Sequence, residues 1–147
     1  MNGTGRQLFL AIAILAGIGI AVSSVSLNHH YRKSKTSYCD FGESFNCDLV
    51  NRSEYSTIAG MPVALIGMLG YGALLAFATA YRRKAETPAI LCAGALAGLG
   101  FALYLTYVEK FVLGSWCILC LCSLAMIASI SVLAVALVAS SRRRRAS

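Results

Sequence analysis

The sequence predicts an all-α integral membrane protein, a bundle of four transmembrane helices with one long extracytoplasmic loop. Of its 147 residues, 58% are hydrophobic and only 13% are charged. A soluble domain of this size could not cover so much apolar surface. The charged residues are also clustered between long uncharged runs, and a run of ~20 apolar residues is enough to cross a bilayer. We therefore expect one membrane domain that covers residues 1–147.

Four uncharged runs predict the transmembrane helices. They cover residues 8–27, 58–81, 89–108 and 115–140. The first run follows Arg6 and could also be a secretory signal peptide. It is longer than the usual core of a signal peptide and three more runs follow it, so a retained first span is favoured.

Three residues predict where the later helices begin. Pro62 is expected in the first turn of the second helix, where its missing N–H costs little. Thr87 and Pro88 are expected at the N-cap and at the first position of the third helix. Ser115 is a good N-cap residue and predicts the start of the fourth helix.

Residues 28–57 form the one long polar segment, the loop between the first and second spans. It holds four basic and four acidic residues, so it carries no net charge, and it contains Cys39 and Cys47. Its apolar residues are spaced as in a short amphipathic helix that could lie on the membrane surface. These residues are Phe41, Phe45, Leu49, Val50 and Tyr55.

The basic residues predict the orientation. Arg6, the 82–84 turn and the 142–145 tail contribute eight basic residues, against Glu86 alone. With four spans these segments share one side, which the positive-inside rule makes cytoplasmic. The 28–57 loop and the turn before Cys117 then face the opposite side, where disulfides persist. The net charge of +7 is thus explained by topology, and we expect no nucleic-acid partner.

The most informative motif is the Cys-x-x-Cys pair of Cys117 and Cys120. At ~100° per residue the two side chains point to nearly the same helix face, so they can form a disulfide. With Ser115 as N-cap, Cys117 would lie in the first turn, where the helix dipole stabilises a thiolate. A thiolate is the species that attacks a disulfide, so the pair is expected to be redox-active rather than inert packing. Cys92 and Cys122 are expected to be small packing residues.

Cys39 and Cys47 are separated by seven residues. They could form a structural disulfide, worth ~2–3 kcal/mol for so short a loop, or a second redox pair that passes electrons to Cys117. Four thiolates could also bind zinc. Because Ile118 and Leu119 are apolar and neither histidine has ligand spacing to a partner, we expect no metal.

These motifs resemble those of the vitamin K epoxide reductase family, in particular its bacterial branch without a fused thioredoxin domain. The matching segments, in order, are Cys39-Asp40, Cys47-Asp48, Ser53, Gly60-Met61-Pro62-Val63-Ala64-Leu65-Ile66-Gly67, Tyr104-Leu105-Thr106-Tyr107 and Trp116-Cys117-Ile118-Leu119-Cys120. The resemblance runs from about Leu8 to the end of the fourth span. The other four-helix quinone-coupled oxidase family carries its two cysteine pairs in the reverse order.

The resemblance implies an enzyme, a membrane thiol–disulfide oxidoreductase with a cysteine relay. Cys39 would meet the thiol of a soluble thioredoxin-fold disulfide carrier (DsbA-like), and Cys47 would exchange with Cys117. Cys120 would deliver the electrons to a membrane quinone, ubiquinone or menaquinone, with no nucleotide cofactor. Ser53 lies where the family often keeps a hydroxyl near the quinone. The implied location is a bacterial inner membrane with cytoplasmic termini and periplasmic cysteines.

Two positions differ from the vertebrate enzyme. Leu124 stands where that enzyme has a tyrosine, and Val63 where it has an asparagine, both associated with binding of the vitamin K substrate. The resemblance therefore implies quinone reduction coupled to disulfide formation rather than epoxide reduction. The alternative function is a non-catalytic four-helix membrane scaffold with one structural loop disulfide, in which Cys117 and Cys120 would stay inert.

Overall fold

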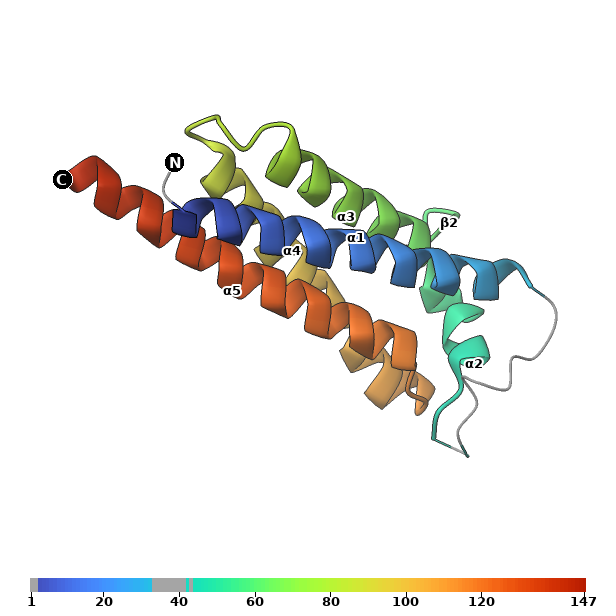
Figure 1. Ribbon diagram of the computed structural model, residues 1–147. Coiled ribbons are helices and arrows are strands. Elements are labelled where there is room, and N and C mark those ends of the chain that lie inside the picture. Colours follow the sequence, from blue (N-terminus) through green and yellow to red (C-terminus); the bar gives the residue numbers. More distant parts are fainter. Residues whose placement is uncertain (1–2, 33–41, 43) are drawn as a thin grey trace.

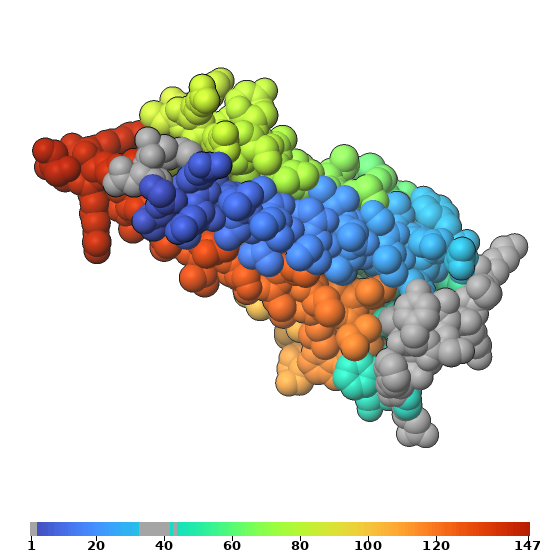
Figure 2. All heavy atoms as spheres, viewed as in Figure 1, coloured from blue at the N-terminus to red at the C-terminus, as the bar shows by residue number. Residues whose placement is uncertain are grey.

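The computed structural model describes residues 3–32, 42 and 44–147. Four helices form its body (Figure 1): α1 (Gly3–Tyr31), α3 (Val63–Thr79), α4 (Thr87–Val108) and α5 (Ile118–Ala146). Both α1 and α4 pack against α3 and against α5, so α1 and α4 lie diagonally across the bundle. The space-filling view shows α1 between α3 and α5 on one face (Figure 2). The all-α class predicted from the sequence is confirmed.

Among the described residues, three segments are long and apolar enough to cross a bilayer. They are α1 with 29 residues, Thr87–Leu113 with 27 and α5 with 29. α3 is equally apolar but has only 17 residues, fewer than the ~20 that span the hydrocarbon core. Four spans therefore remain a prediction. The outer faces of the helices are apolar, with Leu10, Leu69 and Val132 each at least 60% exposed, as expected for surfaces that contact lipid.

The second helix begins later than the predicted residue 58. Thr57–Ile58 (β1) pairs antiparallel with Met61–Pro62 (β2). The two residues between them, Ala59 and Gly60, have positive φ of 52° and 81°, as a tight hairpin turn requires. α3 therefore starts at Val63, and Pro62 is its N-cap rather than a residue of its first turn.

The third helix starts two residues before the predicted residue 89 and ends at the predicted residue 108. Its N-cap is Glu86, not Thr87, whose hydroxyl instead donates to the Tyr81 carbonyl at 2.6 Å. The predicted turn after residue 108 is wrong, because the chain continues as a π-helical segment, η2 (Glu109–Leu113). Gly114 ends this segment in the left-handed conformation, with φ of 63°.

The fourth helix begins at Ile118, so Ser115 is not its N-cap. Trp116 forms a parallel bridge with Phe45 in the loop. The Trp116 N–H donates to the Ser44 carbonyl at 2.9 Å, and the Trp116 carbonyl accepts from the Asn46 N–H at 3.1 Å. Because this pairing holds the chain extended, the N-cap moves to Cys117.

The loop predicted over residues 28–57 is shorter in the structure. α1 continues to Tyr31, and two short helices follow, α2 (Cys47–Asn51) and η1 (Glu54–Ser56). The predicted amphipathic helix is thus confined to Cys47–Asn51, with Tyr55 in η1 and Phe45 in the bridge. Phe41 and Cys39 lie outside the described residues.

The two halves of the bundle differ in packing. The half near the termini is a solid core of apolar side chains, which includes Ile12, Leu91 and Ile130, all fully buried. The half near α2 encloses a cavity. Between them Tyr71 of α3 crosses the bundle: its ring fits against Gly19 of α1, where a Cβ would lie 2.5 Å from it. The Tyr71 hydroxyl hydrogen-bonds to Ser123 of α5 at 2.9 Å.

The basic segments gather at the end of the bundle that carries both termini (Figure 1). The 82–84 turn, Arg144 and Arg145 line one groove there, and the Arg145 guanidinium donates to the Ala85 carbonyl at 2.9 Å. α5 continues through the arginines to Ala146, beyond the predicted residue 140. The common location agrees with the predicted sidedness, and the orientation in the membrane stays a prediction.

Candidate active site

The short helix α2 is fixed against the end of α1. The Asn46 side chain caps it by accepting from the Leu49 N–H at 2.9 Å. The Ser26 hydroxyl of α1 donates to the Asn51 side chain at 2.7 Å, and His29 Nδ1 lies 3.6 Å from the Asp48 carboxylate. These polar contacts set the position of Cys47, the first residue of α2.

Cys47 and Cys117 lie in one buried cluster together with Val50, although they are far apart in the sequence. Both side chains are fully buried. Cys47 is disulfide-bonded, and Cys39, its predicted partner, lies outside the described residues. The structure therefore brings together Cys47 and Cys117, the two residues that the predicted relay joins.

Asn51 connects the two cysteine segments. Its side-chain amide donates to the Cys47 carbonyl at 3.0 Å and to Cys117 Sγ at 3.7 Å. Its oxygen is held by Ser26, so the direction of the amide is fixed. An amide donor directed at a sulfur favours the thiolate over the thiol.

Cys117 is a free thiol at the N-cap of α5. The hydrogen bond from the Cys120 thiol lowers the pKa of Cys117 below its usual value, and the backbone N–H groups of Cys120 and Leu119 act in the same direction. Burial and the nearby Glu109 carboxylate oppose this shift without reversing it. Cys117 is therefore disposed to be the nucleophile of the pair.

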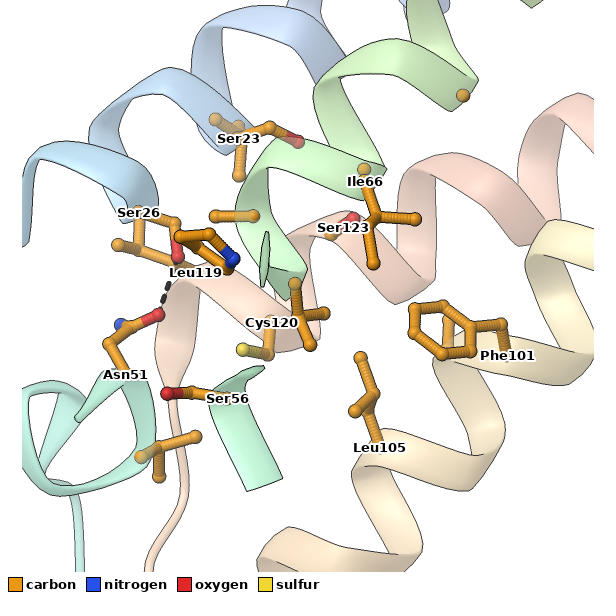
Figure 3. A pocket seen from close by; sticks show the side chains of 18 of the residues that line it. Ser23, Ser26, Asn51, Ser56, Ile66, Phe101, Leu105, Leu119, Cys120 and Ser123 are labelled. Carbon is orange, nitrogen blue, oxygen red and sulfur yellow. Dashed lines mark hydrogen bonds between the residues drawn. The ribbon is translucent and has the colours of Figure 1, made fainter. Parts of the chain in front are cut away.

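Cys120 has different surroundings, because it lines the cavity and Cys117 does not. The cavity has a volume of about 340 Å³, within the range of small-molecule sites. In the close-up (Figure 3), Cys120 lies between the polar pair Ser26–Asn51 and the apolar side chains of Phe101 and Leu105. The lining is mostly apolar with a few polar groups, the composition expected of a site for an apolar molecule with polar ends.

Glu109 is a second titratable side chain at the dithiol. It is only 2% exposed and lines the same cavity. One of its oxygens, Oε2, accepts from the Cys117 N–H at 3.2 Å. The Glu109 carboxyl thus fixes the start of α5, the role that the sequence assigned to Ser115.

The remaining predicted residues are placed as follows. Ser53 lines the cavity, and its hydroxyl donates to the Val50 carbonyl at 2.9 Å. Cys92 is half-buried and packs against the apolar core, as predicted. Cys122 is exposed on α5, so the prediction that it is a packing residue is wrong. Within the described ranges, no three His, Cys, Asp or Glu side chains form a group that could hold a metal.

Comparison with known families matches residues 10–135 to the Vitamin K epoxide reductase family. The match covers α2, α3, α4, the Cys117–Cys120 pair and most of α1 and α5. The chain belongs to this family. Vitamin K epoxide reductase family members are in general quinone-linked thiol oxidoreductases of membranes that work with thioredoxin-like partners. Membership therefore argues against a non-catalytic scaffold.

Two side chains of the site, Asn51 and Glu109, are not predicted from the sequence. Asn51 has no distinguishing pattern, because its role depends on the contact of α2 with Cys117. Glu109 did carry a signal: an acidic residue at the end of a long apolar run is expensive in a membrane and is commonly functional. The sequence predicts a turn at Glu109, where the structure has η2 instead.

Proposed function

We propose that this chain is a quinone-dependent thiol oxidase that regenerates a soluble thioredoxin-fold disulfide carrier. In each cycle the carrier's dithiol becomes a disulfide, and two electrons and two protons reduce a membrane quinone to the quinol. The enzyme thereby supports disulfide formation in exported proteins. We place the cysteines on the periplasmic side of a bacterial inner membrane and the termini in the cytoplasm.

The observation that carries this proposal is the division of the dithiol between two environments. Cys117 packs against Cys47 on the loop side, whereas Cys120 lines the apolar cavity. This arrangement supports a relay in which Cys39 meets the carrier, Cys47 exchanges with Cys117, and Cys120 faces the quinone. Ser53 is the hydroxyl that we assign to the quinone site.

Two positions support a simple quinone, ubiquinone or menaquinone, over vitamin K epoxide as substrate. Val63 lines the cavity where the vertebrate enzyme has an asparagine, and Leu124 replaces its tyrosine. Both changes remove a hydrogen-bonding group.

The test uses the full chain in proteoliposomes that contain ubiquinone or menaquinone, with a reduced thioredoxin-fold carrier outside. We expect one quinol for each carrier disulfide formed. Cys117→Ser and Cys120→Ser should each lower the rate by roughly 10³-fold or more, since each removes a reacting sulfur. Cys122→Ser, on the outer face of the same helix, is the matched control and should keep the wild-type rate. Repeated turnover with quinol formation in either of the first two variants, beyond the single oxidation of the carrier by the Cys39–Cys47 disulfide, would refute the proposal.

A further inference from the structure

Glu109 is a buried acid with no assigned role in electron transfer. It lies near the end of the Thr87–Leu113 segment, where an ionisable side chain is costly, yet it is 2% exposed. It is also the first residue of η2, the π-helical segment. Such segments are uncommon and often occur at functional sites.

The contacts of the carboxyl group place it between the thiols and the cavity. Its Oε2 accepts from the Cys117 N–H at 3.2 Å, and the Cys120 thiol lies beside the carboxyl. Its other oxygen, Oε1, is buried and has no hydrogen-bond partner among the described residues. Buried polar atoms are nearly always satisfied. An unsatisfied carboxylate oxygen in the wall of a substrate-sized cavity therefore points to a partner that is present only during the reaction.

We propose that Glu109 is the proton-transfer residue between the Cys117–Cys120 dithiol and a quinone bound in the cavity. This inference rests on the proposed function and adds to it the acid–base group of the quinone step. The geometry suits the role, because one carboxyl group contacts a reacting thiol and also borders the space for the electron acceptor.

The step balances as follows. Two S–H bonds break, the Cys117–Cys120 S–S bond forms, and the electron pair passes to the quinone. The Glu109 carboxylate takes the proton of the Cys120 thiol and, as the carboxylic acid, gives it to one quinone oxygen. The proton of Cys117 is released to water as its thiolate forms, and the second quinone oxygen takes a proton from water. Glu109 ends as the carboxylate, ready for the next turnover.

A purely structural role makes a different prediction. If Glu109 served only to hold the Cys117 N–H, a glutamine would serve equally well, because its amide oxygen can accept the same hydrogen bond. Glutamine cannot carry a proton at neutral pH. Glu109→Gln therefore separates the two roles with almost no change in size.

The experiment measures two partial reactions in proteoliposomes. The first is single-turnover reduction of the enzyme's disulfides by the reduced carrier without quinone. The second is reduction of added quinone by the reduced enzyme, followed from pH 5 to 9. Glu109→Gln should keep the first rate within about threefold and slow the second by ~10²–10⁴-fold, the usual range for a lost acid–base group. It should also remove one ionisation from the pH profile of the second reaction.

Two controls separate this inference from the proposed function. Glu54→Gln changes an exposed acid in η1 and should leave both partial reactions unchanged, whereas Glu109→Asp should restore part of the second rate. If wild-type enzyme reduces quinone and Glu109→Gln does so within threefold, or if both partial reactions slow equally, Glu109 is not the proton-transfer residue and the proposed function stands. If the wild-type enzyme itself reduces no quinone, the proposed function fails and this inference with it.

Discussion

Cys117 and Cys120 stand three residues apart in one motif and lie in different surroundings. Cys117 is sealed against Cys47 and the Asn51 amide, on the side of the loop. Cys120 lines the cavity, on the side of the apolar bundle interior. One helix turn thus separates two reactions. Cys117 is placed to exchange with another disulfide, and Cys120 is placed to react with a small apolar molecule. Variants on each side should impair one partial reaction more than the other.

The largest separation is expected from Asn51→Leu on the Cys117 side. The change keeps the side-chain size but removes the donor to the Cys47 carbonyl and to Cys117 Sγ, and it leaves the Ser26 hydroxyl without its acceptor. We expect exchange between Cys47 and Cys117 to slow by ~30-fold and the free energy of unfolding to fall by ~1–3 kcal/mol. Quinone reduction by the already reduced enzyme should slow by a smaller factor, because Asn51 also lines the cavity.

Stopped-flow mixing of reduced carrier with the oxidised variant measures this exchange. Asn28→Leu, at an exposed position of α1, is the matched control. An equal slowing of the quinone reaction in Asn51→Leu would show that Asn51 supports the whole site and not the Cys117 side alone.

A smaller effect is expected from filling the cavity on the Cys120 side. Leu105 of α4 lines the cavity, and Leu105→Trp would occupy part of it. We expect KM for the quinone to rise ~10-fold, equivalent to about 1.4 kcal/mol of binding, with exchange between the carrier and the enzyme unchanged. Steady-state kinetics at varied quinone concentration provide the measurement.

Leu103→Trp supplies the comparison for that substitution. Leu103 is on the same helix, is 53% exposed and does not line the cavity. Leu103→Trp should keep the wild-type KM for the quinone. If both tryptophans raised KM alike, the effect would come from the helix surface and the cavity would not be the quinone site.

The smallest expected effect is a shift in the pKa of Cys117 when its hydrogen bond from Cys120 is removed. The hydrogen bond from the Cys120 thiol is the largest cause of the lowered pKa of Cys117. Cys120→Ala removes that donor, so the Cys117 pKa should rise and its thiolate should form at higher pH than in the reduced wild-type enzyme. Thiolate absorbance at 240 nm, corrected with a Cys117→Ser, Cys120→Ala variant, follows this titration. An unchanged midpoint would mean that the two thiols do not interact.

Much of the fold could be predicted because its causes are local. Uncharged runs predicted the helices, and basic clusters predicted which segments share an end of the bundle. Helix starts were less accurate where distant segments intervene. Ser115 is a good cap in isolation, but pairing of Trp116 with the loop holds the chain extended and delays α5 to Ile118. Likewise the Ala59–Gly60 turn, not Pro62 alone, decides where α3 begins.

The site shows the same limit. The Cys-x-x-Cys spacing indicates a redox pair without any structure, because it depends only on the helical period. The spacing does not reveal which thiol lines a cavity, since that depends on side chains from α1, α3 and α4. Asn51 and Glu109 contribute through tertiary contacts that no local pattern encodes.

The relay from Cys47 to Cys117 is tested most directly by trapping. In Cys120→Ser the resolving sulfur is absent, so the Cys117 thiolate can attack Cys47 of the Cys39–Cys47 disulfide, release Cys39 as a thiol and leave a Cys47–Cys117 disulfide that should accumulate without added reductant. In a non-reducing tryptic digest, this disulfide links peptide 36–52 to peptide 111–142. A second cleavage after Phe41 or Phe45 separates Cys39 from Cys47. We predict the Cys47–Cys117 link with Cys39 as a free thiol. A Cys120→Ser enzyme in which Cys117 stays free and Cys47 forms no link to it would contradict the account.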